Sequence, residues 1–119
     1  MRRRGALYSA SAHGRRTEVH QLIVITGSVV ARLETVADLR AISLEHTRRS
    51  RLEPGCLSHD VHVDLENELR LVFVETWQDR AAVATHFAVP ASLEFVRAAR
   101  KLAAEPSVIR VYAAEAIEV

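Results

Sequence analysis

The sequence predicts an α+β domain with one four-stranded antiparallel sheet, and three observations support this fold class. Runs of β-branched and aliphatic residues alternate along the chain with stretches of helical periodicity. At 119 residues the chain has the common size of a single domain and is too short for a second independent core. Apolar residues make up 49% and charged residues 26%, the balance of an ordinary globular protein.

The first half of the domain is expected to form a strand and then a helix. Residues 20–32 are mostly β-branched and aliphatic, which favours a core strand, and Gly27 within it indicates a bulge or a close backbone approach. Thr35 and Asp38 have the spacing of a capping box, so a helix is predicted over residues 36–51. Its inward face is expected to carry Val36, Leu39, Ile42 and His46.

The second half predicts a hairpin, two helical segments and a last strand. Residues 56–65 and 69–77 are two strand-like runs joined by a polar link at residues 66–68. Asp79 is expected to cap a helix that runs through Phe87, and Pro90 to begin another that reaches about Ala104. The tail at residues 107–119 alternates apolar and polar residues, which predicts a strand.

The resulting order is βαββαβ, the ferredoxin-like arrangement, with the second helical region split at Pro90. Two helices cover only one face of such a sheet, yet apolar residues alternate on both faces of these strands. We therefore expect a homodimer in which two sheets pack face to face.

Charge divides the chain into a leader over residues 1–19 and a domain over residues 20–119. The first 20 residues hold five arginines against Glu18 alone, and this stretch lacks the apolar core of a secretory signal, so we expect a disordered basic leader. The mildly acidic domain argues against nucleic-acid binding, and no apolar stretch is long enough to cross a membrane. Cys56 is the single cysteine, which excludes an internal disulfide and fits a cytoplasmic protein.

Several motifs occur in an order that resembles a known family. They are SRLEPGCL at residues 50–57, VFVETWQDRAAVATHF at residues 72–87, and then Pro90 and Phe95. In order and spacing this pattern is similar to the antibiotic biosynthesis monooxygenase family, over residues 22–119. The resemblance implies a dimeric α+β barrel with a pocket between sheet and helices. It also implies, as in several members, oxygenation of quinols or aromatic polyketides without a cofactor.

Some residues depart from the family pattern. His59 stands where the family's turn has a tyrosine, and the link between the hairpin strands is short. Haem-degrading relatives use an asparagine, a tryptophan and a histidine, and this chain has His86 and Val96 in place of the last two. The resemblance therefore does not favour haem, and fold alone does not decide the reaction.

Three titratable side chains are candidates for catalysis. His86 is a candidate base for a phenol or quinol, and a histidine that merely bridges sheet and helix is an equal alternative. His46 is predicted to face the same cavity, although a satisfied core histidine is the more common case. Glu75, if buried, would have a raised pKa and act as a base; the commoner alternative is pairing with an arginine: Arg70, Arg97 or Arg110.

The candidate substrate-binding residues are Trp77, Phe73, Phe87, Phe95 and His59, with the aromatic rings as walls for a planar substrate. The simpler alternative for Trp77, Phe87 and Phe95 is a place in the hydrophobic core. Tyr112 in the last strand is a candidate dimer contact. His59 and His62 lie three apart on a strand and face opposite sides, so no metal site is predicted from them. The chain lacks the HExxH, P-loop, GxGxxG and GxSxG motifs, which leaves zinc hydrolysis, nucleotide binding and serine catalysis without support.

The leading hypothesis is a cytoplasmic, cofactor-independent monooxygenase that oxidises a small aromatic substrate, a quinol or a phenolic polycycle, with dioxygen. His86 would be the base, with Glu75 or His46 assisting. Two alternatives remain open: a non-catalytic dimeric module that binds a small ligand, and an isomerase that uses the same pocket.

Overall fold

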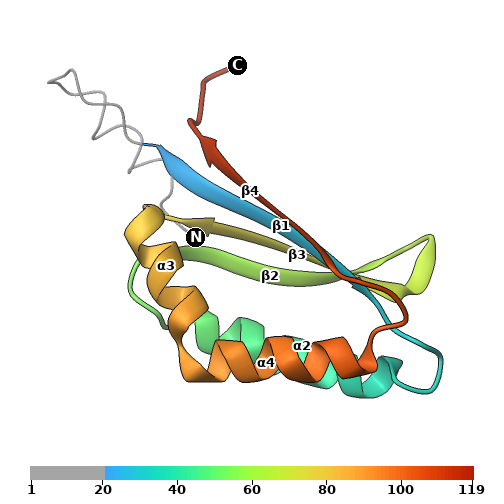
Figure 1. Ribbon diagram of the computed structural model, residues 1–119. Helices are drawn as coiled ribbons and strands as arrows, with labels where there is room; N and C mark the ends of the chain where they lie inside the picture. The colour runs from blue at the N-terminus through green and yellow to red at the C-terminus, as the bar shows by residue number, and fades with distance from the viewer. Residues whose placement is uncertain (1–20) are drawn as a thin grey trace, which may run out of the picture.

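The computed structural model describes residues 21–119, so the expectation of a disordered leader at residues 1–19 lies outside the described part. Four strands and three helices follow one another along the chain (Figure 1). They are β1 (Leu22–Val30), α2 (Val36–Ser50), β2 (Cys56–Asp64), β3 (Asn67–Trp77), α3 (Arg80–Ala88), α4 (Pro90–Leu102) and β4 (Val108–Ala114).

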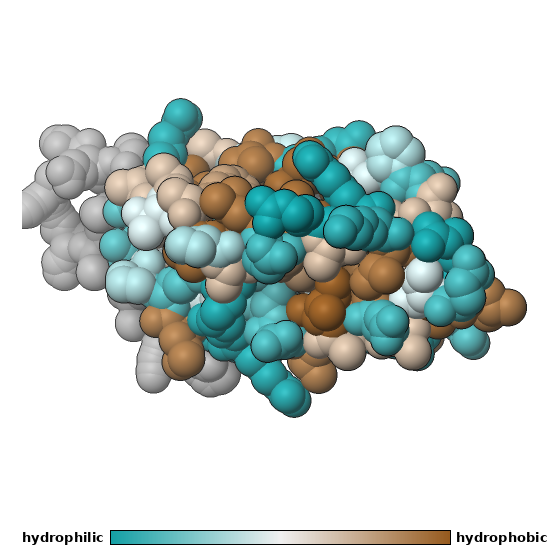
Figure 2. Space-filling model, turned by 60° about the horizontal axis from the view of Figure 1, so that its bottom comes forward, coloured by the Kyte–Doolittle hydropathy of each residue, from teal (hydrophilic) through white to brown (hydrophobic). Residues whose placement is uncertain are grey.

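The four strands form one antiparallel sheet in the order β2-β3-β1-β4, with β1 and β3 in the centre. All three helices lie on the same side of this sheet (Figure 1). This topology confirms the predicted ferredoxin-like α+β fold. Figure 2 turns the helical side toward the viewer, and hydrophilic and hydrophobic side chains are interspersed over it.

The core lies between the sheet and the helices, and it has two parts. One cluster surrounds Leu39 of α2, which is fully buried, and joins it to Leu71 of β3 and Ala99 of α4. The other surrounds Trp77 at the end of β3 and joins it to Ile25 and Val83. Burial of a leucine side chain such as Leu39 contributes roughly 1.5–3 kcal/mol. The functional side chains described below lie between these two clusters.

The helix α2 begins where it was predicted, but its start is stabilised differently. The hydroxyl of Thr35 makes no capping bond to the helix; it donates to the carbonyl of Leu102 at 2.6 Å and accepts from the Arg32 amide at 3.0 Å. The capping-box prediction is therefore wrong, because Thr35 ties the loop before α2 to the end of α4 instead.

Two predicted boundaries also differ from the structure. The hairpin link consists of residues 65–66 rather than 66–68, since Asp64 already pairs with Asn67. The last strand ends at Ala114, whose partner Leu22 is the first residue of β1. The apolar residues Ile117 and Val119 lie beyond this last pair and are exposed.

Gly27 lies in the middle of β1, and the strand register passes through it without interruption. The predicted bulge is therefore absent, and the backbone approach at Gly27 is an ordinary van der Waals contact rather than an unusually close one. A Cβ atom at this position would lie 3.4 Å from the carbonyl oxygen of Val108. Because Gly27 has no side chain, the helix-facing surface of the sheet beside β4 is hollow at this position.

The face of the sheet that carries no helix is partly apolar. Val24, Val74 and Tyr112 share this face by strand pairing, and Val74 and Tyr112 are among the exposed large apolar or aromatic residues. Within residues 21–119, no helix is long and apolar enough to span a membrane.

Gly55 forms the turn between α2 and β2 and has a positive φ of 86°. Its carbonyl accepts a hydrogen bond from the Gln78 amide at 2.8 Å, which fixes the turn to the end of β3. A Cβ atom here would lie only 2.5 Å from the Cβ of Ala82 in α3. Glycine is therefore required for both backbone conformation and space.

We expect Gly55→Ala to lower the free energy of unfolding by about 1–3 kcal/mol, because alanine is strained at this φ and collides with α3. Urea denaturation followed by circular dichroism measures the change. Gly27→Ala is the matched control, because its new Cβ makes only a 3.4 Å contact at an ordinary φ. Equal stability of Gly55→Ala and the unmodified protein would contradict this account of the turn.

Candidate functional site

Three histidines meet in the interior between the two core clusters. His46 comes from α2, His59 from β2 and His86 from α3, and all three are buried. Their ring centroids lie 5.2–5.7 Å apart. The elements bring together residues separated by up to 40 positions, so the cluster is a product of the tertiary fold.

His86 is held by a carboxylate. Its Nδ1 lies 2.8 Å from Oε1 of Glu53, and the other carboxylate oxygen of Glu53 lies 3.0 Å from Nη1 of Arg49. A carboxylate paired with a guanidinium accepts hydrogen bonds, so Nδ1 of His86 donates to Glu53. The neutral ring then has its lone pair on Nε2, the arrangement of a carboxylate-oriented general base.

Arg49 fixes the second histidine in the opposite tautomer. Its Nη2 lies 2.8 Å from Nδ1 of His46, and because a guanidinium has donors only, this nitrogen of His46 accepts. Neutral His46 therefore carries its proton on Nε2. Burial, followed by the neighbouring His59, His86 and Arg49, lowers the pKa of His46 to about 3. His46 is thus a hydrogen-bond donor at Nε2 rather than a second base.

Glu75 and Trp77 share a face of β3 as predicted, and the indole N–H donates to Glu75 Oε1 at 2.9 Å. Oε2 of Glu75 lies 3.3 Å from Nε2 of His59, close enough to attract but not aligned as a hydrogen bond. Burial alone would raise the pKa of Glu75, but contacts with His59, Trp77 and His86 lower it below its usual value.

Two expectations about Glu75 are therefore corrected. Its pKa is not raised, so it is a weak base, and within residues 21–119 its carboxylate contacts Trp77 and His59 rather than an arginine. Among the proposed arginine partners, Arg70 pairs with Asp64 and Arg97 with Glu94.

A cavity of about 620 Å³ opens beside the histidines, between the sheet and α4 with the segment that leads to β4. His46, His86 and Glu75 line it, together with Phe73, Phe87 and Phe95 as predicted. The ring of Phe95 stacks on His46 with centroids 4.1 Å apart and an angle of 7°. The cavity is thus walled by aromatic rings and has polar groups at one end, as is typical of small-molecule sites.

Trp77 and His59 do not line this cavity: the alternative of a core aromatic is confirmed for Trp77, and the assignment of His59 as a substrate contact is corrected. Both are fully buried one layer behind it. Trp77 packs under α3 and lies 4.5 Å from His86 between ring centroids, while His59 faces the other two histidines. Trp77 ends β3, where it pairs with β1 and β2, and His59 of β2 pairs with Glu75 of β3.

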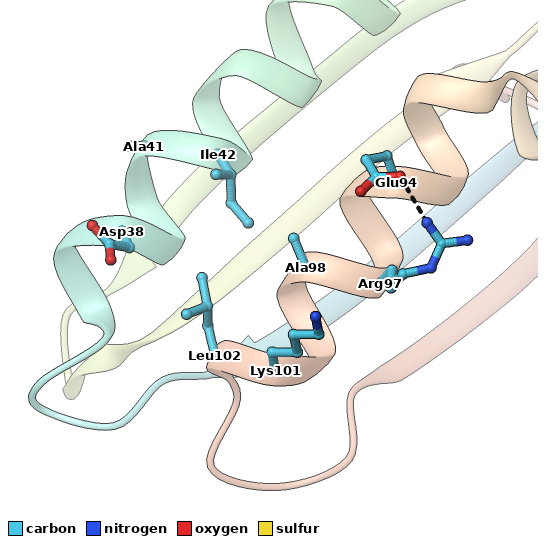
Figure 3. Close-up of a pocket in the computed structure, with 8 residues that line it drawn as sticks. All are labelled: Asp38, Ala41, Ile42, Glu94, Arg97, Ala98, Lys101 and Leu102. Carbon is cyan, nitrogen blue, oxygen red and sulfur yellow. Dashed lines mark hydrogen bonds and ion pairs between the residues drawn. The ribbon is translucent and has the colours of Figure 1, made fainter.

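A second, shallower groove of about 360 Å³ lies between α2 and α4 (Figure 3). Charged side chains at its rim include Asp38 and Lys101, and Glu94 pairs with Arg97 at 2.7 Å (Figure 3). The described lining holds no histidine, cysteine or aromatic ring. The histidine-lined cavity is therefore the candidate functional site.

The sequence interpretation missed Arg49, and it treated Glu53 only as part of a family motif. A signal was present, because His46, Arg49 and Glu53 are spaced by three and four residues and share one helical face. Glu53 lies just past the end of α2, and its carboxylate reaches His86 of α3 at 2.8 Å.

Comparison with known proteins agrees with the fold and the motifs. The family model described as "Antibiotic biosynthesis monooxygenase" matches residues 23–98. The chain belongs to the antibiotic biosynthesis monooxygenase family. The resemblance inferred from the sequence motifs is thereby confirmed.

Individual proteins are also similar to this family member. An uncharacterized protein of Synechocystis is 33% identical over 90 residues, which cover 76% of this chain and 61% of that protein. A Deinococcus radiodurans structure is 30% identical with a TM-score of 0.77, covering 82% of this chain and 97% of that one. A Mycobacterium tuberculosis structure, 24% identical with a TM-score of 0.75 and the same coverages, supports the fold.

Cys56 is half-buried at the edge of the site, and burial, followed by the charges of Glu75 and Glu53, raises the pKa of its thiol to about 11. The thiol is therefore protonated at neutral and mildly alkaline pH, and we expect native protein to react slowly with iodoacetamide there. Alkylation followed by mass spectrometry measures the rate, with urea-unfolded protein as the control. Equal rates for folded and unfolded protein would contradict the raised pKa.

Proposed function

We propose that this family member is a cofactor-independent monooxygenase that oxidises a quinol or a phenolic polycyclic aromatic compound with dioxygen. The observation that supports it best is the pair of opposite tautomers. His86 offers a lone pair at Nε2 and His46 offers an N–H, and both residues line a cavity with aromatic walls. A base and a donor at one end of an aromatic cavity suit deprotonation of a phenol.

The proposed reaction needs no electron donor besides the substrate. Nε2 of His86 takes the hydroxyl proton of a quinol, and the resulting anion transfers one electron to dioxygen. The two radicals combine into a carbon–oxygen bond, and the peroxide anion takes the proton back from His86. Loss of the ring hydrogen and the distal oxygen as water leaves a hydroxyquinone. One quinol and one dioxygen thus give one hydroxyquinone and one water.

The chain's residues have separate roles in this scheme. Glu53 and Arg49 are positioning residues, because they touch His86 and His46 but do not line the cavity. The N–H of His46 stabilises the negative charge on the substrate oxygen or the peroxide. Phe73, Phe87 and Phe95 hold the planar ring.

Oxygen uptake by EDTA-treated protein with a panel of quinols and anthrone-like phenols tests the proposal. We expect uptake above the spontaneous rate, and a fall of about 10²–10⁴-fold in His86→Ala, because the base is lost. Glu53→Gln should lower kcat while KM stays near its original value, because Glu53 orients the base and does not line the cavity.

The matched control is His62→Gln, whose exposed side chain lies on the opposite face of β2. It should retain the original rate. No uptake across the panel would overturn the proposal: tight binding without turnover would identify a ligand-binding module, and conversion without oxygen consumption an isomerase.

We also propose that two copies assemble through the sheet face that carries Val74 and Tyr112. A partly apolar sheet face without a helix is stabilised by a second such face. Sedimentation at micromolar concentration is expected to give the mass of two chains, and Val74→Asp to give one, because a buried unpaired charge is costly. A single-chain mass for the unmodified protein would contradict this assembly.

A further inference from the structure

We propose that His46, His59 and His86 form a binding site for a divalent transition-metal ion such as Zn²⁺ or Co²⁺. One ring nitrogen from each residue lies within 4.8 Å of the other two, and all three side chains are buried. Neutral imidazole is a ligand for such ions. This inference does not rest on the proposed oxygenase function.

His59 supplies the strongest evidence. Its side chain is fully buried, and neither ring nitrogen makes a hydrogen bond among residues 21–119; the one charged group beside it is Glu75, whose Oε2 lies 3.3 Å from Nε2. A buried polar ring that makes no hydrogen bond is costly, and buried polar groups are almost always satisfied. Because His59 faces both other histidines, a metal ion at their centre would coordinate one of its nitrogens.

The surroundings of His86 match those of a metal ligand. A ligating histidine commonly donates its second nitrogen to a carboxylate, which fixes the ring and makes the first nitrogen more basic. Nδ1 of His86 has this partner in Glu53, at 2.8 Å, and Glu53 is held in turn by Arg49. Nε2 of His86 is the nitrogen left for the ion.

Charge also favours a cation. Glu53 and Glu75 contribute two negative charges beside the three rings, and Arg49 contributes one positive charge. With neutral histidines the cluster therefore has a net charge of −1. Glu75, 3.3 Å from His59, is a carboxylate close enough to serve as a fourth ligand or to hold a metal-bound water.

Binding requires a small contraction of the site. Zn–N distances of 2.0–2.1 Å place the nitrogens of a tetrahedral site about 3.4 Å apart, so the rings must move inward from separations of up to 4.8 Å. His46 must also exchange its contact with Arg49 for the metal, either at Nδ1 or by moving its proton to Nδ1. Arg49 keeps Glu53 as its partner through Nη1.

Metal binding and base catalysis exclude each other at His86, since both use the lone pair on Nε2. Metal-loaded protein is therefore expected to lack the proposed oxygenase activity, and removal of the ion to restore it. The ion would act as an inhibitor at the substrate site rather than as a cofactor.

Titration of EDTA-treated full-length protein with Co²⁺ tests the site. We expect one equivalent per chain with the visible absorption of four-coordinate Co²⁺, its displacement by Zn²⁺, and a rise in Tm on Zn²⁺ binding. His59→Ala and His86→Ala should each weaken binding at least about tenfold, as loss of even an outer partner does. His62→Ala is the control on the same strand and should bind as the unmodified protein does.

Three outcomes would overturn the site: no binding to the unmodified protein, only the spectrum of hydrated Co²⁺, or affinity unchanged in both His59→Ala and His86→Ala. If these variants fold poorly, the spectrum of the unmodified protein still decides. Because binding is measured without substrate and oxygen uptake without metal, either proposal can fail while the other stands.

Discussion

The ion pair between Arg49 and Glu53 is the interaction on which the candidate site depends. The two charged side chains contact two histidines on different helices. Glu53 accepts a hydrogen bond from His86, and Arg49 donates one to His46. Two chemically identical rings thereby become a proton acceptor and a proton donor. Glu53 itself stands just past the end of α2, where its carboxylate reaches His86 of α3.

The interior contains more buried polar side chains than the packing of helices on a sheet requires. On α2, the buried residues besides Leu39 are all polar, and the hydroxyls of Ser43 and Thr47 lack hydrogen-bond partners within residues 21–119. A sheet covered by helices needs only apolar contacts for stability, and buried polar groups reduce it. Such residues are retained in proteins where function requires them, so the polar face of α2 supports a functional interior.

The fold was predictable because hydrophobic periodicity carries it. Every element was located from strand alternation, the expected cap at Asp79 and the break at Pro90. Asp79 accepts a hydrogen bond from the Ala82 amide, as expected. The site was only partly predictable. His86, His46 and the phenylalanines were found by residue type, but the cavity excludes Trp77 and His59, and Arg49 was missed. Side-chain partners depend on how α2, β2 and α3 bring His46, His59 and His86 together, which periodicity does not encode.

The same three histidines support two kinds of chemistry, and His59 distinguishes them. Acid–base chemistry requires only His86, His46 and the ion pair that orients them. A third buried imidazole that makes no hydrogen bond lowers stability and does nothing for that acid–base pair. A metal site, by contrast, uses His59 directly, because three nitrogens from three elements define the closed side of a coordination sphere. The burial of His59 without a hydrogen bond, beside the carboxylate of Glu75, is therefore better explained by coordination than by proton transfer alone.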